Sequence, residues 1–241
     1  MKIPIKEIDV LIVGAGAAGM MCALTAAQRG RSVLLLDHSS KLAEKIRISG
    51  GGRCNFTNLN TKPENFISQN PHFCRSALAG YTPQHFISML NKHGIGYHEK
   101  TLGQLFCDDG SEAIIAMLKK ECDDAGVHWS MRCSVEEVVR SDAFYVTTTR
   151  GKYRAKSLVI ATGGLSIPKI GATPFGYKVA EQFGVPMTKL KPGLVPLTFA
   201  PDDWKPYADL TGVSLDTIVS FDKQSFRENM LVTHRGLSGP A

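Results

Sequence analysis

The sequence lacks the cysteine patterns that mark zinc sites and disulfide frameworks. It contains no CxxC pair and no regular cysteine spacing; the six cysteines are Cys22, Cys54, Cys74, Cys107, Cys122 and Cys133. Structural zinc sites and small secreted domains need such patterns, so both classes are excluded and no metal site is expected. A reducing, cytoplasmic compartment is the simplest expectation. The sequence also contains no internal repeat and no low-complexity tract.

Acidic and aromatic residues are few relative to the cations. The chain of 241 residues has a net charge of +6, and only 8% of its residues are aromatic. A positive balance can indicate a nucleic-acid or membrane partner, but such surfaces group their cations. Here the cations are scattered, and no aromatic group accompanies the densest clusters, Lys41/Lys45/Arg47/Arg53 and Arg150/Lys152/Arg154/Lys156. The expected partner is therefore a small-molecule substrate, with no nucleic acid and no membrane.

Long hydrophobic runs are also scarce, with one exception at the N-terminus. Residues 10–27 carry no charge, which by hydropathy alone is typical of a signal peptide or a membrane span. Asp9 borders this run, three glycines interrupt it, and Arg29 and Arg31 follow it. These features favour a buried strand followed by a buried helix.

The glycines of this run form a GxGxxG motif. It follows a predicted strand at residues 8–13 and opens a predicted helix at 17–29, and a second strand at 32–36 ends at Asp37. In dinucleotide-binding folds the glycines permit a tight turn, close approach of the backbone to a pyrophosphate, and close packing of helix and strand. The carboxylate of the acid accepts hydrogen bonds from the ribose hydroxyls. The motif does not by itself distinguish NAD from FAD, or a ligand site from a packing turn. The cofactor-binding residues predicted here are Gly14, Ala15, Gly16, Ala17, Ala18, Gly19, Asp37 and His38.

The remaining pattern predicts an α/β fold with two domains. Helices are expected at 82–93, 111–125 (with Ser111 as N-cap) and 176–183, and residues 39–60 read as a long loop. Strands are expected at 127–131, in a β-meander at 134–140, 144–149 and 152–156, and at 157–161. After Pro192 the chain becomes β-rich, at 195–199, 214–221 and 229–232. The boundary is placed after Lys191, giving a dinucleotide-binding domain at 1–191 and the start of a β-rich substrate or insert domain at 192–241.

Two segments carry a resemblance to known flavoproteins. Ala161-Thr162-Gly163-Gly164 follows a meander and resembles the ATG segment of flavoproteins with two dinucleotide-binding folds. Lys45 and the run Arg47-Ile48-Ser49-Gly50-Gly51-Gly52-Arg53-Cys54-Asn55 resemble the BaiN-like bacterial FAD-binding flavoproteins, also called the aminoacetone oxidase family. The resemblance continues in family order at residues 171–177, 194–197 and 233–240.

This resemblance implies FAD as the cofactor and a Rossmann-like ββα FAD-binding domain with an inserted β-rich domain and a helical domain. It also implies a longer chain, whose final segment returns to cover the flavin. The 241-residue chain is therefore expected to be a product that lacks its C-terminal closing segment.

Further cofactor contacts are expected from the glycine-rich loop and the cations around it. Backbone N–H groups of such a loop can face an anionic flavin or phosphate, and Arg53 could stabilise the reduced flavin. Cys54 has no nearby cysteine partner, so it is expected to be a structural or flavin-edge thiol. Arg53 and His234 are the candidates for catalysis, and Val135 is expected to bind the adenine through its backbone. The cofactor-binding residues predicted here are Lys45, Ser49, Gly50, Gly51, Gly52, Arg53, Cys54, Asn55, Val135, Ala161, Thr162, Gly163 and Gly164.

The predicted function is an FAD-dependent oxidoreductase that transfers a hydride between flavin and a small organic substrate. The resemblance favours reduction of a conjugated C=C bond or oxidation of an amine. No second GxGxxG is present, so NAD(P)H would dock only transiently as a donor. The alternatives are an NAD-dependent enzyme, a non-catalytic fragment, and a nucleic-acid-binding flavoprotein such as a tRNA-modifying enzyme.

Overall fold

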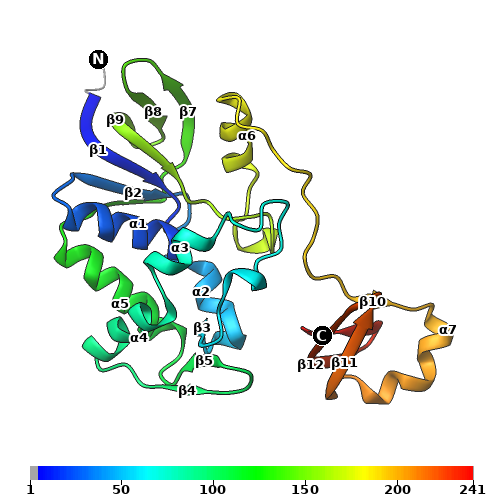
Figure 1. The fold of residues 1–241 in the computed structure, drawn as a ribbon. Coiled ribbons are helices and arrows are strands. Elements are labelled where there is room, and N and C mark those ends of the chain that lie inside the picture. Colours follow the sequence, from blue (N-terminus) through cyan, green and yellow to red (C-terminus); the bar gives the residue numbers. More distant parts are fainter. Residues whose placement is uncertain (1–4, 241) are drawn as a thin grey trace. The chain divides into compact units, whose positions relative to one another are not determined.

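The computed structural model describes residues 5–240, which fall into two compact units divided between Met187 and Thr188 (Figure 1). The sequence places the boundary slightly later, after Lys191, where the proline-rich stretch begins. Residues 185–196 form no helix or strand. The two units are described separately.

The first unit is built on a six-stranded mixed sheet in the order β6-β2-β1-β9-β8-β7. Strand β1 is parallel to both β2 and β9, and β2 is parallel to β6. Strands β7, β8 and β9 form the predicted antiparallel meander. The strands span β1 Ile5–Val13, β2 Val33–Asp37, β6 His128–Met131, β7 Val135–Arg140, β8 Phe144–Thr148 and β9 Gly151–Ile160.

Strand β9 joins two predicted stretches. The sequence predicts that the last meander strand, at 152–156, runs into a parallel strand at 157–161, and the structure has both as one strand of ten residues. Its first half pairs with β8, and nearly its whole length pairs with β1. The chain makes no turn between Lys156 and Ser157, so the strand continues out of the meander and into the parallel part of the sheet.

Both faces of the parallel strands are covered. On one face, Ile12, Val33 and Leu35 pack in a core with helices α1 (Ala17–Gln28) and α5 (Ser111–Asp124). On the other face, Leu11 and Leu36 pack in a second core with residues of the meander and of α6 (Phe175–Gln182). Strands covered on both faces need continuous apolar runs, which explains why β1 and β2 lack a polar alternation.

Residues 39–60 are not the long loop that was expected. They contain α2 (Glu44–Ile48), the 3₁₀ helix η1 (Ser49–Gly52) and β3 (Asn55–Asn58). Strand β3 pairs with β5 (Gln104–Cys107), which also pairs with β4 (Tyr97–Glu99). These strands are three or four residues long, so they show too little alternation to be recognised in the sequence. Helices α3 (Arg75–Gly80) and α4 (Pro83–Lys92) and the 3₁₀ helix η2 (Pro63–Asn65) complete this region.

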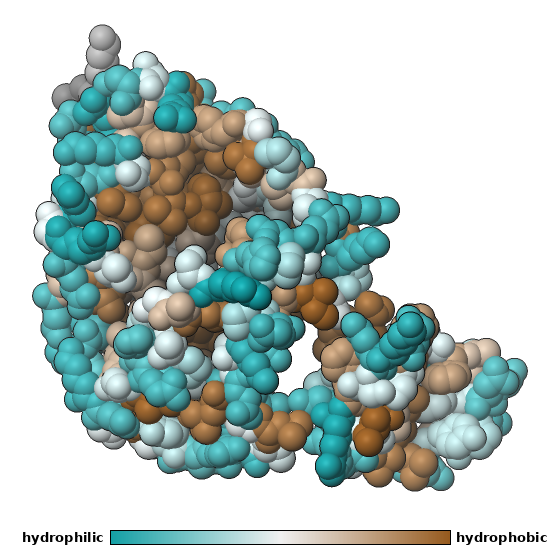
Figure 2. Space-filling view, in the orientation of Figure 1, coloured by the Kyte–Doolittle hydropathy of each residue, from teal (hydrophilic) through white to brown (hydrophobic). Residues whose placement is uncertain are grey.

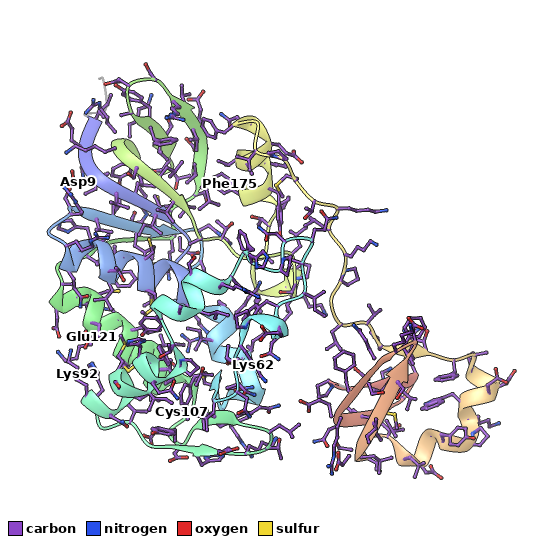
Figure 3. All side chains as sticks on the ribbon, viewed as in Figure 1. Asp9, Lys62, Lys92, Cys107, Glu121 and Phe175 are labelled. Carbon is purple, nitrogen blue, oxygen red and sulfur yellow. The ribbon has the colours of Figure 1, made fainter. Side chains whose placement is uncertain are left out.

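Helix α5 begins differently from the prediction. Its N-cap is Gly110, with φ 80°, and the Ser111 hydroxyl instead donates to the carbonyl oxygen of Arg47 at 2.9 Å. Farther along α5, the carboxylate of Glu121 is buried and lies 2.6 Å from both Lys92 Nζ and His93 Nε2 (Figure 3). Hydrogen bonds from Lys92 and His93 lower the pKa of Glu121. These contacts attach α5 to α2 and α4.

The second unit contains an antiparallel sheet in the order β10-β13-β12-β11. The predicted strand at 214–221 matches β11, whereas the one at 195–199 shrinks to β10 and the one at 229–232 is part of the longer β12. Trp204 anchors the unit: its ring stacks on Phe199, and its Nε1–H donates to the Thr233 carbonyl at 2.8 Å. The elements are β10 Leu197–Thr198, α7 Pro201–Trp204, η4 Lys205–Leu210, β11 Ser214–Phe221, β12 Gln224–Thr233 and β13 Gly236–Ser238.

Within residues 5–240, no helix is long and apolar enough to cross a membrane.

Candidate functional site

A cleft of about 680 Å³ opens where the parallel strands of the first unit end. Its walls include Val13 at the end of β1, Asp37 at the end of β2 and Ile160 at the end of β9. Brown, apolar side chains line a hollow in the space-filling view of this unit (Figure 2). Ligands of open α/β sheets bind at the carboxyl ends of the strands, so this cleft is the candidate cofactor site.

The turn between β1 and α1 brings the backbone close to the ends of two neighbouring strands. Gly14 N–H donates to the Leu36 carbonyl at 2.8 Å, and Ala161 N–H donates to the Val13 carbonyl at 2.8 Å. A Cβ on Gly14 would lie 2.5 Å from the Ala161 oxygen, so only glycine fits there. The structure therefore places the GxGxxG turn directly against the Ala161–Gly163 segment.

Helix α1 directs its N-terminus at the cleft. Its N-cap, Gly16, makes no side-chain cap, and Gly16, Ala17 and Ala18 all line the cleft. The first N–H groups of a helix have no intrahelical partner and carry a partial positive charge, which suits a diphosphate. A Cβ on Gly16 would meet no protein atom within 4 Å, so its missing side chain leaves room for a ligand. Ala15 and Gly19 are buried and do not line the cleft.

Asp37 shapes the turn as well as the cleft wall. Its Oδ2 accepts the Ala15 N–H at 2.8 Å, and its Oδ1 accepts the Ser39 N–H at 2.7 Å. A carboxylate oxygen accepts more than one hydrogen bond, so both oxygens retain capacity for ribose hydroxyls. His38 also lines the cleft, and its imidazole Nε2 would lie 2.9 Å from a Cβ on Gly171.

Val135 lies on the cleft wall, beside Cys133 and Ser134. Cys133 N–H donates to the Asp37 carbonyl at 2.8 Å, which ties this stretch to the end of β2. Val135 thus lies on the same side of the cleft as Asp37, and adenine binding by its backbone stays a prediction.

Lys45 joins two walls of the cleft. Its ammonium donates to the Gly164 carbonyl oxygen at 3.0 Å, while Ala161, Thr162 and Gly163 lie on the wall that this contact reaches. Gly164 itself is not on the wall. An ammonium group has three donors, so Lys45 can hold this turn and also contact a phosphate.

The glycine-rich run at 49–55 lies elsewhere. None of its residues is on the cleft wall: Arg53 is exposed, and Gly50 packs so close to Phe106 that a Cβ would lie 2.7 Å from the ring. Cys54 is buried between η1 and β5, and burial raises the pKa of its thiol. Cofactor binding by this run stays a prediction; the residues concerned are Ser49, Gly50, Gly51, Gly52, Arg53, Cys54 and Asn55.

His234 lies in the turn between β12 and β13 of the second unit and is exposed. A catalytic role for it also stays a prediction.

Two stretches of the cleft wall carry no signal that the sequence pattern revealed. One is α2 and the segment before it, including Lys41 and Ile46; the other follows the 3₁₀ helix η3 (Pro168–Ile170) and ends at Phe175 (Figure 3). The motif at 171–177 was noted only as part of the resemblance. The missed wall residues are Val13, Ser39, Lys41, Ala43, Glu44, Ile46, Cys133, Ser134, Ile160, Ile170, Gly171, Ala172, Thr173 and Phe175.

The residues present fit a dinucleotide. A helix N-terminus with a small residue at each of its first positions can receive the diphosphate, and Asp37 can receive a ribose. The apolar part of the wall, including Ile46, Ile160 and Phe175, can pack against flat rings.

Comparison of the sequence with known proteins identifies a family and several relatives. The sequence profile of the HI0933-like protein Rossmann domain matches residues 8–230. The chain is 50% identical over 238 residues to the ribosomal RNA dihydrouridine synthase of Escherichia coli, covering 98% of this chain and 60% of the relative. It is 49% identical to the enzyme of that name from Haemophilus influenzae, over 96% of this chain and 59% of the relative. The chain thus spans about 60% of the length of these relatives.

More distant likenesses agree on the fold. The chain is 27% identical to the 3-dehydro-bile acid delta(4,6)-reductase of Clostridium scindens, over 95% of this chain and 57% of the relative. A solved 3-ketosteroid-Δ4-(5α)-dehydrogenase from Rhodococcus jostii matches with a TM-score of 0.51 and 17% identity, over 66% of this chain and 46% of that one. The predicted Rossmann-like α/β fold is confirmed, and so is the predicted cofactor, FAD.

Proposed function

We propose, from the premise that this chain belongs to the HI0933-like family, that it is part of an FAD-dependent reductase that converts uridine to dihydrouridine in ribosomal RNA. The observation that carries this proposal is the identity of 50% and 49% to two ribosomal RNA dihydrouridine synthases, which extends over nearly the whole chain. Identity at this level includes the cleft and the second unit, not only the GxGxxG turn.

Reduction of a C=C bond is the chemistry common to these relatives and to the bile acid reductase. The chemistry that FAD supplies when bound is hydride transfer. The uracil ring gains one hydride and one proton across its double bond, and NAD(P)H, docking transiently, is oxidised. The described residues of the chain would bind and orient the cofactor: α1 would receive the diphosphate and Asp37 the ribose, while Lys45, bonded to Gly164, holds the wall formed by residues 161–163.

A conjugated small molecule is the second candidate substrate. It follows from the sequence prediction, and the bile acid reductase at 27% identity favours it. The ribosomal RNA proposal takes precedence because of the much higher identity to the two synthases.

The test combines a spectrum with a product assay. The purified protein, loaded with FAD and desalted, should show flavin absorption that NADPH bleaches in the absence of oxygen. Incubation with ribosomal RNA that lacks dihydrouridine should then yield dihydrouridine, detected by mass spectrometry of the digested nucleosides. Free uridine and a conjugated enone serve as comparison substrates. Reduction of the enone with no change in the RNA would favour the second candidate and contradict the first.

A further inference from the structure

The first unit carries a long stretch of exposed residues outside the cofactor cleft. All ten residues from 64 to 73 are exposed, between the start of η2 and α3. Three of them are large and apolar: Phe66 is 48% exposed, Ile67 86% and Phe73 81%. Such side chains are usually buried, so a group of them in one short segment indicates a contact surface. We call residues 62–75 the exposed segment.

A cation lies on the far side of each aromatic ring of this segment. Lys62 precedes Phe66, and Arg75 follows Phe73 (Lys62 is labelled in Figure 3). Neither Lys62 nor Arg75 forms an ion pair with any residue of the described range 5–240. Glu64 is the one acid of the segment. The surface is therefore apolar and positively charged.

A cavity of about 250 Å³ lies within the segment. Its lining includes Phe66, Ile67, Ser68 and Arg75. A uracil base has about eight non-hydrogen atoms, counting its two carbonyl oxygens, and needs less room than about eight water molecules, which take about 30 Å³ each in the liquid. The cavity is therefore large enough for one base, with an apolar wall for its face and polar groups for its edge.

Hydrogen bonds hold the backbone of the segment in shape. Lys62 N–H donates to the Asn65 side chain at 2.9 Å, and His72 N–H donates to the Asn70 side chain at 3.0 Å. The Ser68 hydroxyl donates to the Asn70 carbonyl at 2.7 Å. These local bonds pair polar groups within the turns. The apolar side chains take no part in them and are left available for a partner.

We propose that the exposed segment binds single-stranded RNA and so helps to present the substrate; this inference rests on the proposed function. Bases that have left a helix stack on aromatic side chains, and their phosphates pair with Lys and Arg. Phe66 and Phe73 supply the rings, Lys62 and Arg75 the charges, and the cavity receives one base. The positive charge of the segment favours RNA over an apolar protein surface. RNA phosphates supply counter-charges to Lys62 and Arg75, whereas a protein surface with few acidic residues would leave both without them.

The test measures RNA binding by the FAD-loaded protein. The probe is a fluorescein-labelled oligouridylate of about twelve nucleotides, a length within the usual range for single-strand sites. The double variant Phe66→Ala/Phe73→Ala should raise the Kd, measured by anisotropy, about tenfold or more, because each lost stacking contact weakens binding. Phe221→Ala is the matched control, since Phe221 is 87% exposed and lies in the second unit. An unchanged flavin spectrum shows that the variants are folded.

A second variant isolates the charge. Arg75→Gln should reduce the slope of log Kd against log salt by about 0.7, as expected for one lost contact to a single-strand phosphate. Arg29→Gln, at an exposed arginine after α1, should leave the slope unchanged.

The outcomes separate this inference from the proposed function. If the wild-type protein forms dihydrouridine while Phe66→Ala/Phe73→Ala binds the oligouridylate unchanged, the surface is wrong and the function stands. If the variants weaken RNA binding but no dihydrouridine is formed, the surface stands and the function is wrong. If the wild-type protein binds no oligouridylate, and the double variant instead abolishes self-association seen by sedimentation, the segment is a protein interface and the inference fails.

Discussion

The turn at residues 14–19 and the turn at residues 50–52 are both rich in glycine, but different physical constraints require glycine in each. In the first turn the main constraint, at Gly14 and Gly19, is space, and Gly14 also has a positive φ of 110°. A Cβ on Gly19 would overlap the carbonyl oxygen of Gly14, and one on Gly14 would lie 2.5 Å from the Ala161 oxygen. Three backbone segments meet here because β1, β9 and α1 converge at the cleft.

In the second turn the main constraint is the backbone angle. Gly50, Gly51 and Gly52 all have positive φ, of 56°, 68° and 88°. A Cβ on Gly51 would meet nothing within 4 Å, and one on Gly52 would only touch the Arg47 carbonyl at 4.0 Å. At Gly51 and Gly52, side chains other than glycine are disfavoured by local strain and not by neighbours, whereas at Gly50 the Phe106 ring adds a steric limit. Similar composition therefore does not indicate a similar role, and only the first turn lines the cleft.

The largest effect is expected at the centre of the first turn. Gly19→Ala should lower the free energy of unfolding by about 3 kcal/mol or more, because the added methyl group overlaps backbone that cannot move without separating α1 from the sheet. Urea unfolding of the variant and the wild type measures this change. A loss below about 1 kcal/mol would show that the turn can open at low cost.

A smaller loss is expected at the acid that supports this turn. Asp37→Asn keeps the size of the side chain but removes one acceptor, so either the Ala15 or the Ser39 N–H loses its partner. Stability should fall by about 1–2 kcal/mol. FAD affinity should fall as well, as measured by flavin fluorescence during titration. Equal stability of the two proteins would mean that water replaces the lost bond.

Gly16→Ala separates ligand binding from folding. The methyl group has room in the protein, so unfolding should change by less than about 0.5 kcal/mol. It projects where the diphosphate would approach α1, so FAD should bind about tenfold more weakly or worse. Unchanged FAD affinity in a titration monitored at the flavin band would move the diphosphate away from this helix end.

The smallest effect on FAD binding is expected in the second turn. Gly51→Ala should cost about 1 kcal/mol through backbone strain alone, and Gly51→Asn less, because asparagine tolerates positive φ better. FAD retention should stay at the wild-type level in both variants if the turn is structural. Loss of flavin from Gly51→Asn, with its stability intact, would restore the run at 49–55 to the cofactor site and so remove the contrast between the two turns.

Several elements were predictable because their signals are local. The apolar run before Gly14, the Ala-rich helix after it and the strand ending at Asp37 follow each other within one βαβ unit, and the structure has them nearly as expected. The three-stranded sheet of β3, β4 and β5 was not predictable, because its short strands are defined by partners distant in sequence. Ser111 shows the same limit: it looks like an N-cap, but in the folded chain Arg47 is its partner.

The sequence by itself determined the dinucleotide fold and its cofactor class, because a tight turn at a strand end leaves few residue choices and those choices are contiguous. The tertiary structure decided which residues share the cleft. It brought Lys45 to Gly164 and the η3–Phe175 stretch to the same wall, and it carried Arg53 away from that wall. It also left the side chains of Phe66, Phe73, Lys62 and Arg75 exposed, although the four residues are close in the sequence. Such arrangements depend on how separate elements pack, which no local pattern records.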